Sequence, residues 1–355
     1  MTFGQSTKLS TQSGATKLAP RARATPGRTL AVCLALAAAL VSSVVITAAV
    51  GSQRLPLYAS LCAVFTGGSP SCGLTPEQRS ILFDIRLPRI LLAGAVGASL
   101  AAAGAGYQAL LRNPLAEPYL LGISNGAAVG TMFALVFLGA HDWARPALAF
   151  GGALSASFVV YRLARGRTGA TPERLILAGV IVTTFLSSVI VFITTLMDAT
   201  RVRSFSFWLL GDLSGTTKDL LVLAIIAAVL GTLALAAHAR PLNLMMIGER
   251  DAFDLGVEVG RVRITVFLTA SMLVGASVAS SGSVGYVGLV VPHLVRLSFG
   301  SDNRLTIPAA ALSGALFVIV ADTVARTVIS PRELPVGAIT ALIGAPLFVY
   351  LLRRG

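Results

Sequence analysis

Ionisable side chains are rare inside the apolar stretches of this chain, which limits the chemistry that it can perform. His293 and Asp322 stand out as the two that lie away from obvious loop positions. An intramembrane hydrolase or a proton-coupled carrier needs a nucleophile with its base, or a set of carboxylates and histidines, at membrane depth. The scarcity of such groups argues against both, and we expect no catalytic residue and no metal site.

A phosphate-binding loop is also missing from the sequence. Such a loop reads GxxxxGK[ST], whereas Lys8, Lys17 and Lys218 each follow a threonine. We therefore expect no cofactor on this chain. If ATP drives its function, a partner subunit hydrolyses the ATP.

The composition predicts a polytopic membrane protein. Hydrophobic residues make up 55% of the 355 residues, charged residues make up 12%, and the mean hydropathy is +0.81. This is too little charge to cover a soluble globule of that size. The net charge of +13 is spread over short segments between apolar runs, unlike a nucleic-acid-binding surface with interleaved aromatic residues. We expect contact with membrane lipid and no nucleic-acid partner.

Ten segments are apolar over about the 20 residues that a helix needs to cross a membrane. They lie near residues 30–50, 88–111, 118–139, 145–164, 174–197, 217–238, 262–281, 286–299, 306–326 and 335–352. The eighth is unusually short. None alternates with the period of a barrel strand, so the predicted fold is an all-α polytopic membrane protein.

The positive charges predict an orientation with both termini in the cytoplasm. In that orientation 18 of the 28 Lys and Arg residues lie on inner segments, as the positive-inside bias requires. Residues 1–28 carry no acidic group and are predicted to be disordered, which leaves residues 29–355 as the membrane domain. The first apolar run could be a cleaved signal, but its length exceeds the usual core of about 7–15 residues, and we favour an uncleaved span.

The three cysteines say little. Cys62 and Cys72 share the outer loop 51–86 and can pair if that loop faces an oxidising periplasm, although two cysteines ten residues apart are a weak pattern. Their pairing stays open. Cys33, in the first span, is interpreted as a packing residue.

An internal repeat favours a transport function. Residues 96–104, VGASLAAAG, match residues 274–282, VGASVASSG, at six of nine positions. The same offset aligns Pro114 with Pro292, beyond the matched helices. The two copies would cross the membrane in opposite directions, which is the arrangement of transporters whose pathway lies between two inverted halves. Shared Ala- and Gly-rich composition is the alternative.

A polar connector interrupts the apolar runs at residues 111–130, LRNPLAEPYLLGISNGAAVG. Its prolines, Pro114 and Pro118, remove backbone donors and stiffen a reversal of direction. Glu117, Ser124 and Asn125 can cap or hydrogen-bond the next helix. Such a connector moves with its helices, although an ordinary tight turn is the alternative.

The longest inner connector, residues 239–261, combines apolar and acidic residues. Its pattern predicts one or two short amphipathic helices, broken at Gly248 and Gly256. A helix lying on lipid is the alternative, but acidic groups suit an anionic leaflet poorly. We therefore expect a protein partner at this connector.

Three arginines mark the opposite side of the membrane. Arg86 and Arg89 flank Pro88 at the outer mouth of the second span, and Arg326 lies at the outer end of the ninth. Arginines at span ends often extend to lipid headgroups. These three nevertheless lie on the side where positive charge is disfavoured.

Several long motifs resemble a known family. They are RLPRILLAGAVGASLAAAGAGYQALLRNPLAEPYLLGISNGAAVG at 86–130, LNLMMIGERDAFDLGV at 242–257, SGSVGYVGLVVPHLVRL at 281–297 and ELPVGAITALIGAPLFVYLL at 333–352. Together they resemble the FecCD-type, cobalamin-permease-like permeases, which import iron-siderophore complexes, haem and cobalamin through ABC transporters. The resemblance runs from about residue 30 to the end of the chain.

The resemblance implies a type II ABC importer permease fold of ten helices in the bacterial inner membrane. Its partners would be a second copy of this chain, two ATP-binding subunits and a periplasmic substrate-binding protein. It also implies roles for particular residues. These are a cytoplasmic gate at Asn113, Leu115, Thr171 and Pro172; coupling to the ATPase at Leu244, Ile247, Gly248, Glu249, Leu255 and Gly256; and docking of the binding protein at Arg86, Arg89 and Arg326.

Two further hypotheses compete with an importer permease. An ion-coupled secondary transporter would work without a separate ATPase, and an intramembrane enzyme would need catalytic groups that the spans lack. The substrate stays open among siderophore, haem and cobalamin. Residues 204–215, SFSFWLLGDLSG, are expected in the outer part of the pathway.

Overall fold

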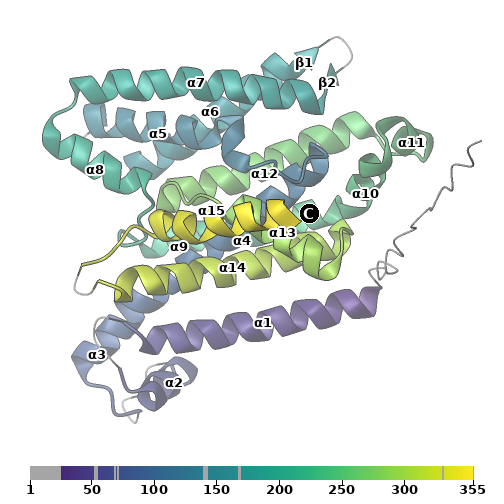
Figure 1. The fold of residues 1–355 in the computed structure, drawn as a ribbon. Coiled ribbons are helices and arrows are strands. Elements are labelled where there is room, and N and C mark those ends of the chain that lie inside the picture. Colours follow the sequence, from purple (N-terminus) through teal and green to yellow (C-terminus); the bar gives the residue numbers. More distant parts are fainter. Residues whose placement is uncertain are drawn as a thin grey trace, which may run out of the picture.

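A computed structural model describes residues 25–51, 55–67, 69, 72–138, 143–166, 169–329 and 332–354. Figure 1 shows long helices that run side by side in one bundle, with shorter elements at its two ends. We call these the α3 end, where α2 and α3 lie, and the α11 end, where α10, α11 and a short hairpin lie. Residues 1–24 of the expected N-terminal segment lie outside the described residues.

Ten apolar helical segments coincide with the ten predicted spans. They are α1 (Pro26–Ala49), α4 (Leu87–Leu110), α5 with η4 (Ile123–Leu138), α6 (Ala144–Ala164), α7 (Pro172–Leu196), α9 (Lys218–Ala237), α12 (Val259–Ser281), α13 (Val287–Phe299), α14 (Asn303–Thr327) and α15 (Val336–Arg354). Within the described residues, seven helices are long and apolar enough to cross a membrane, while α5 with η4, α13 and α15 are shorter. The predicted all-helical fold is confirmed.

Short elements connect these spans. At the α3 end lie α2 (Leu57–Phe65), α3 (Pro76–Ser80) and the π-helix η2 (Ile81–Arg86), which leads directly into α4. The 3-10 helix η3 (Pro118–Leu121) precedes α5, and α8 (Ala199–Leu209) follows α7. At the α11 end lie α10 (Ala239–Ile247), α11 (Glu249–Asp254) and the antiparallel strands β1 (Arg165–Gly166) and β2 (Gly169–Ala170).

Side-chain caps fix where several spans begin. Thr25, Thr171 and Thr217 accept hydrogen bonds from the backbone of α1, α7 and α9, and Asp302 does the same for α14. A side-chain oxygen at this position satisfies a backbone N–H that the helix itself cannot. The helix starts are therefore encoded locally, close to where hydropathy alone places them.

Helix α4 forms the centre of the bundle and is almost wholly buried. Its Gly97 lies against Gly314 of α14, and its Gly104 lies against Gly288 of α13; a Cβ atom on either α4 glycine would clash with the facing carbonyl. Small residues let membrane helices approach closely where no hydrophobic effect between helices drives association. These contacts bring both halves of the chain together at α4.

The two copies of the repeat lie antiparallel, as expected. The Tyr107 hydroxyl, near the C-terminal end of α4, donates to the Phe267 carbonyl in the first half of α12 at 3.2 Å. Arg112, just beyond α4, pairs with Glu249, which precedes α12. Helix α4 thus ends at the α11 end, where α12 begins.

Candidate functional site

The three predicted docking arginines lie together at the α3 end. Arg89 Nε donates to Asp322 Oδ1 at 3.0 Å, and Arg326 Nε donates to Asp322 Oδ2 at 2.9 Å. Arg89 Nη1 also contacts Glu333 Oε2 at 2.6 Å. Arg86 Nη1 donates to the Ala48 carbonyl at the end of α1, at 3.1 Å. Three arginines and two carboxylates leave one net positive charge in this cluster.

The three arginines of this cluster are largely buried, and their docking role stays a prediction. Arg86 is 4% exposed, and Arg89 and Arg326 are each 7% exposed. The reason is Asp322, which is fully buried in α14 and so compensates the two guanidinium groups that flank it. Asp322 stood out in the sequence, but its pairing with Arg89 and Arg326 was not anticipated.

A small cavity opens onto the arginine cluster. Its volume is about 220 Å³, and its lining includes Gly51, Arg86, Arg89, Arg326 and Glu333. Arginine binds carboxylate through two parallel hydrogen bonds. The cavity is therefore lined by arginine side chains, which can bind a carboxylate.

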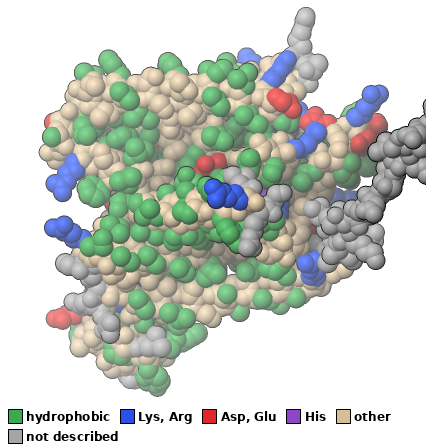
Figure 2. Space-filling model, viewed as in Figure 1, with side chains coloured by type: hydrophobic (Ala, Val, Ile, Leu, Met, Phe, Trp, Pro, Cys, Tyr) green, Lys and Arg blue, Asp and Glu red, His purple; other side chains and the backbone are tan. Residues whose placement is uncertain are grey.

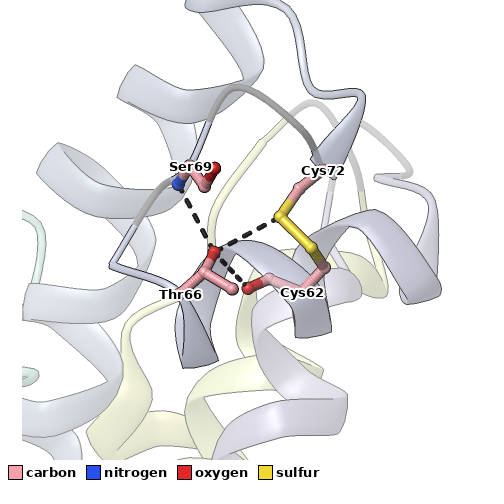
Figure 3. The surroundings of a disulfide bond; sticks show 4 residues. All are labelled: Cys62, Thr66, Ser69 and Cys72. Carbon is pink, nitrogen blue, oxygen red and sulfur yellow. Dashed lines mark hydrogen bonds between the residues drawn. A yellow bond between two sulfur atoms is a disulfide. The ribbon is translucent and has the colours of Figure 1, made fainter.

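A disulfide braces the loop beside this cluster. Cys62, on α2, is bonded to Cys72, with 5.5 Å between their Cα atoms. Figure 3 shows the Thr66 hydroxyl close to both cysteines. It donates to the Cys62 carbonyl and lies 3.3 Å from Cys72 Sγ. The structure thus settles a pairing that the sequence left open, and disulfides are typical of an oxidising compartment.

Irregular backbone divides α12 from α13 in the middle of the bundle. Residues 282–286 run between these helices, with Gly282 and Tyr286 at φ values of 67°. Val284 exchanges two hydrogen bonds with the Tyr119 hydroxyl, at 2.9 and 3.0 Å, and the Tyr286 N–H donates to Glu117 Oε1 at 3.2 Å. Side chains from the first half of the chain thus satisfy a break in the second half, as in transporters with discontinuous helices.

Helix α8 and the residues after it reach the same break. The Asp212 N–H donates to the Ser281 carbonyl at 2.8 Å, and the carbonyl of Trp208 lies against Gly282. Gly211 and Gly337 also approach each other closely. The expected pathway segment 204–215 is therefore in contact with the centre of the bundle, although its place in a pathway stays a prediction.

The predicted gate residues lie toward the α11 end. Asn113 Oδ1 accepts the Leu115 N–H at 2.9 Å, which makes the connector a closed turn, and the Leu115 side chain is 42% exposed. Thr171 caps α7, and Pro172 is its first residue. The gate role of these residues stays a prediction.

The predicted coupling residues form two short helices, as the glycines indicated. Helix α10 ends before Gly248, which is extended, and α11 is followed by Gly256 at a φ of 83°. Ile247 is 74% exposed and Leu255 is 65% exposed. Figure 2 shows acidic and basic side chains gathered at this end, on the right of the view. An apolar surface with a charged rim is typical of protein interfaces.

Two members of the coupling set face inward. Leu244 is partly buried and packs against the core, so it offers little surface to a partner. Glu249 Oε1 lies 2.7 Å from Arg112 Nη2 and 2.5 Å from Arg263 Nη2. Phe253, which is 70% exposed, belongs to the outward surface instead; the sequence pattern included it, but the resemblance did not single it out.

The described part of the chain contains no obvious metal-binding site. No group of three or more His, Cys, Asp and Glu side chains is close enough there to hold an ion. His293 packs edge-on against Phe348 with ring centroids 6.3 Å apart.

Residues 35–354 match the FecCD transport family. The chain belongs to this family. It is 42% identical over 303 residues to the cobalamin import system permease protein BtuC of Halobacterium salinarum, covering 82% of this chain and 81% of that protein. It is 40% identical over 287 residues to the hemin transport system permease protein HmuU of Yersinia pestis, covering 77% and 83%.

A solved structure agrees with these relatives. A metal-chelate type ABC transporter in an inward-facing conformation superimposes with a TM-score of 0.81 at 30% identity, covering 92% of this chain and all of that one. The resemblance read from the motifs is thereby confirmed, and so is the permease fold. This chain is a multi-pass membrane protein of a family of transport permeases.

Proposed function

We propose that this chain is the permease subunit of a binding-protein-dependent ABC importer for a metal chelate, such as an iron-siderophore or haem, or for cobalamin. The match of residues 35–354 to the FecCD transport family carries this proposal. The scarcity of ionisable groups inside the spans supports it, because an ion-coupled carrier needs such groups. The chain itself is not an enzyme, and a partner hydrolyses ATP.

The proposed assembly contains two copies of this chain, two ATP-binding subunits and one periplasmic binding protein. The α11 end lies in the cytoplasm together with both termini, and the α3 end lies in the periplasm of a bacterial inner membrane. The Cys62–Cys72 disulfide supports this orientation, because disulfides persist on the oxidising side. The exposed leucines, valines and phenylalanines of α7 and α9 suit lipid or the second copy.

Reconstitution in proteoliposomes tests the function directly. We expect uptake of a ferric siderophore, haem or cobalamin to require ATP and the binding protein. Collapse of the proton gradient should leave the rate of uptake unchanged. Uptake by this chain alone, driven by an ion gradient, would instead establish the secondary-transporter alternative.

The coupling surface offers a second test. We propose that Ile247, Phe253 and Leu255 seat in a groove of the ATPase, and that Ile247→Asp releases the ATPase from the purified complex because it buries an unpaired charge at the contact. Leu244→Asp is a poorer probe, because Leu244 packs against the permease core. If Ile247→Asp complexes kept both ATPase subunits and full transport, this assignment would be wrong.

The gate proposal has its own measurement. Leu115→Gly or Asn113→Gly should raise leak of substrate or uncouple hydrolysis from uptake, since the first removes an exposed side chain and the second opens the turn. Unchanged coupling in both variants would count against a gate at this connector.

A further inference from the structure

The connector between α4 and η3 is held at both ends by charged groups. At its start, Arg112 Nη2 lies 2.7 Å from Glu249 Oε1 of α11. At its close, Glu117 Oε1 accepts the Tyr286 N–H at 3.2 Å. Between them, the Ala116 N–H donates to the Asn113 carbonyl at 3.1 Å. The connector is thus an internally bonded unit that links α11 to the central break.

The backbone of Arg112 has a conformation that is unfavourable for a residue with a side chain. Its φ is 49°, in the left-handed region, which few residues other than glycine adopt. Such strain persists where the surroundings hold it in place. The contact of its side chain with Glu249 ties this residue to α11.

The Glu249 carboxylate joins three elements. It contacts Arg112 of the connector and Arg263 near the start of α12, while it belongs to α11 itself. The Arg263 side chain is 7% exposed, so this guanidinium is a fixed anchor, whereas the Arg112 side chain is 35% exposed and has room to move. A displacement of α11 therefore changes the contact with Arg112 first.

We propose that Glu249 is the positioning residue through which movement of α10 and α11 reaches the connector, by way of its contact with Arg112. This inference rests on the proposed function, because the movement of α10 and α11 comes from the ATPase. It adds to that function a named contact between α11 and the connector.

Thiol labelling of the permease alone in nanodiscs tests this contact without the ATPase. In a Cys33→Ser background, Leu115→Cys reports the accessibility of the connector to a maleimide. We expect Glu249→Gln to raise the labelling rate about fivefold, the lower range of measured coupling between sites. Arg112→Gly, which retains access to the left-handed backbone but removes the guanidinium, should raise it equally, and combining both changes should add nothing.

Glu258→Gln is the matched control. Glu258 pairs with Arg261 at 2.9 Å at the same end of the bundle, but both side chains are largely exposed and neither contacts the connector. We expect its labelling rate to equal that of the parent. Equal rates for parent and Glu249→Gln, or additive effects of Glu249→Gln and Arg112→Gly, would overturn the proposal.

The assembled transporter provides the functional measurement. We expect Glu249→Gln complexes to retain the ATPase subunits but to hydrolyse about five times more ATP per substrate imported, while Glu258→Gln complexes match the parent. An unchanged ratio in Glu249→Gln overturns the inference alone. Parent complexes that import substrate without ATP overturn the proposed function, and the labelling result still decides whether the contact holds the connector.

Discussion

Both ends of the bundle place two arginines against one carboxylate, yet the two carboxylates differ in burial and mobility. At the α3 end, Asp322 is fully buried in the long helix α14 and bonds Arg89 and Arg326. At the α11 end, the Glu249 side chain is 33% exposed and belongs to the six-residue helix α11. A buried carboxylate between two spans fixes the distance between them. A partly exposed carboxylate on a short helix can instead release its arginine partner.

The comparison predicts very different costs for removing each carboxylate. We expect Asp322→Asn to destabilise the permease by about 3–5 kcal/mol, because it removes the one buried counter-charge between two buried guanidinium groups and leaves Arg89 with only the exposed Glu333. Thermal unfolding in detergent measures this loss. Glu333→Gln is the control: its side chain is 51% exposed, so its loss should stay below about 1 kcal/mol. Equal small losses would show that Asp322 does not compensate the arginines.

Docking should depend on Arg86, which lines the cavity and donates to the Ala48 carbonyl. We propose that Arg86 meets an acidic residue of the binding protein, so Arg86→Gln should weaken docking by about 1–2 kcal/mol, and docking of the parent should weaken as salt rises. Surface plasmon resonance measures both effects. Arg79→Gln, which removes a charge from α3 outside the cavity lining, should leave affinity unchanged. Equal losses in both variants would mean that net charge, and not the cavity, attracts the partner.

The α11 end should tolerate the same kind of change. Because the Glu249 side chain is about one-third exposed and only one of its two arginines, Arg263, is buried, we expect Glu249→Gln to reduce the free energy of unfolding by less than Asp322→Asn does. A loss as large as that of Asp322→Asn would mean that Glu249 acts as a fixed structural ion pair, and the contrast between the two ends would disappear.

Removal of the disulfide is expected to have the smallest effect on the stability of the bundle. Loop closure over the short Cys62–Cys72 segment stabilises that loop by about 2–3 kcal/mol in the chain-entropy model. Cys62→Ser with Cys72→Ser should therefore speed proteolysis of residues 55–75 while the unfolding temperature of the spans stays the same. A lower unfolding temperature for the whole bundle would show that α2 supports α1 and, through it, the Arg86 contact at Ala48.

Much of the architecture follows from local sequence. Seven helices of the described residues are apolar runs long enough to cross a membrane, and caps such as Thr25 and Thr171 mark where helices begin. The break at Gly248 and the left-handed Gly256 divide the 242–257 segment as its pattern predicts. These features depend on the hydropathy and backbone preferences of neighbouring residues, and so the sequence by itself determined them.

The partners of the charged residues were decided only by tertiary structure. Arg89 pairs with Asp322, which lies 233 positions away in the sequence. Glu249, on α11, pairs with Arg112, which follows α4. The inward direction of Leu244 and the pairing of Cys62 with Cys72 depend in the same way on how helices pack. An ion pair, a buried face or a disulfide requires two groups within a few ångströms of each other, and hydropathy and spacing along the chain carry no information about that distance.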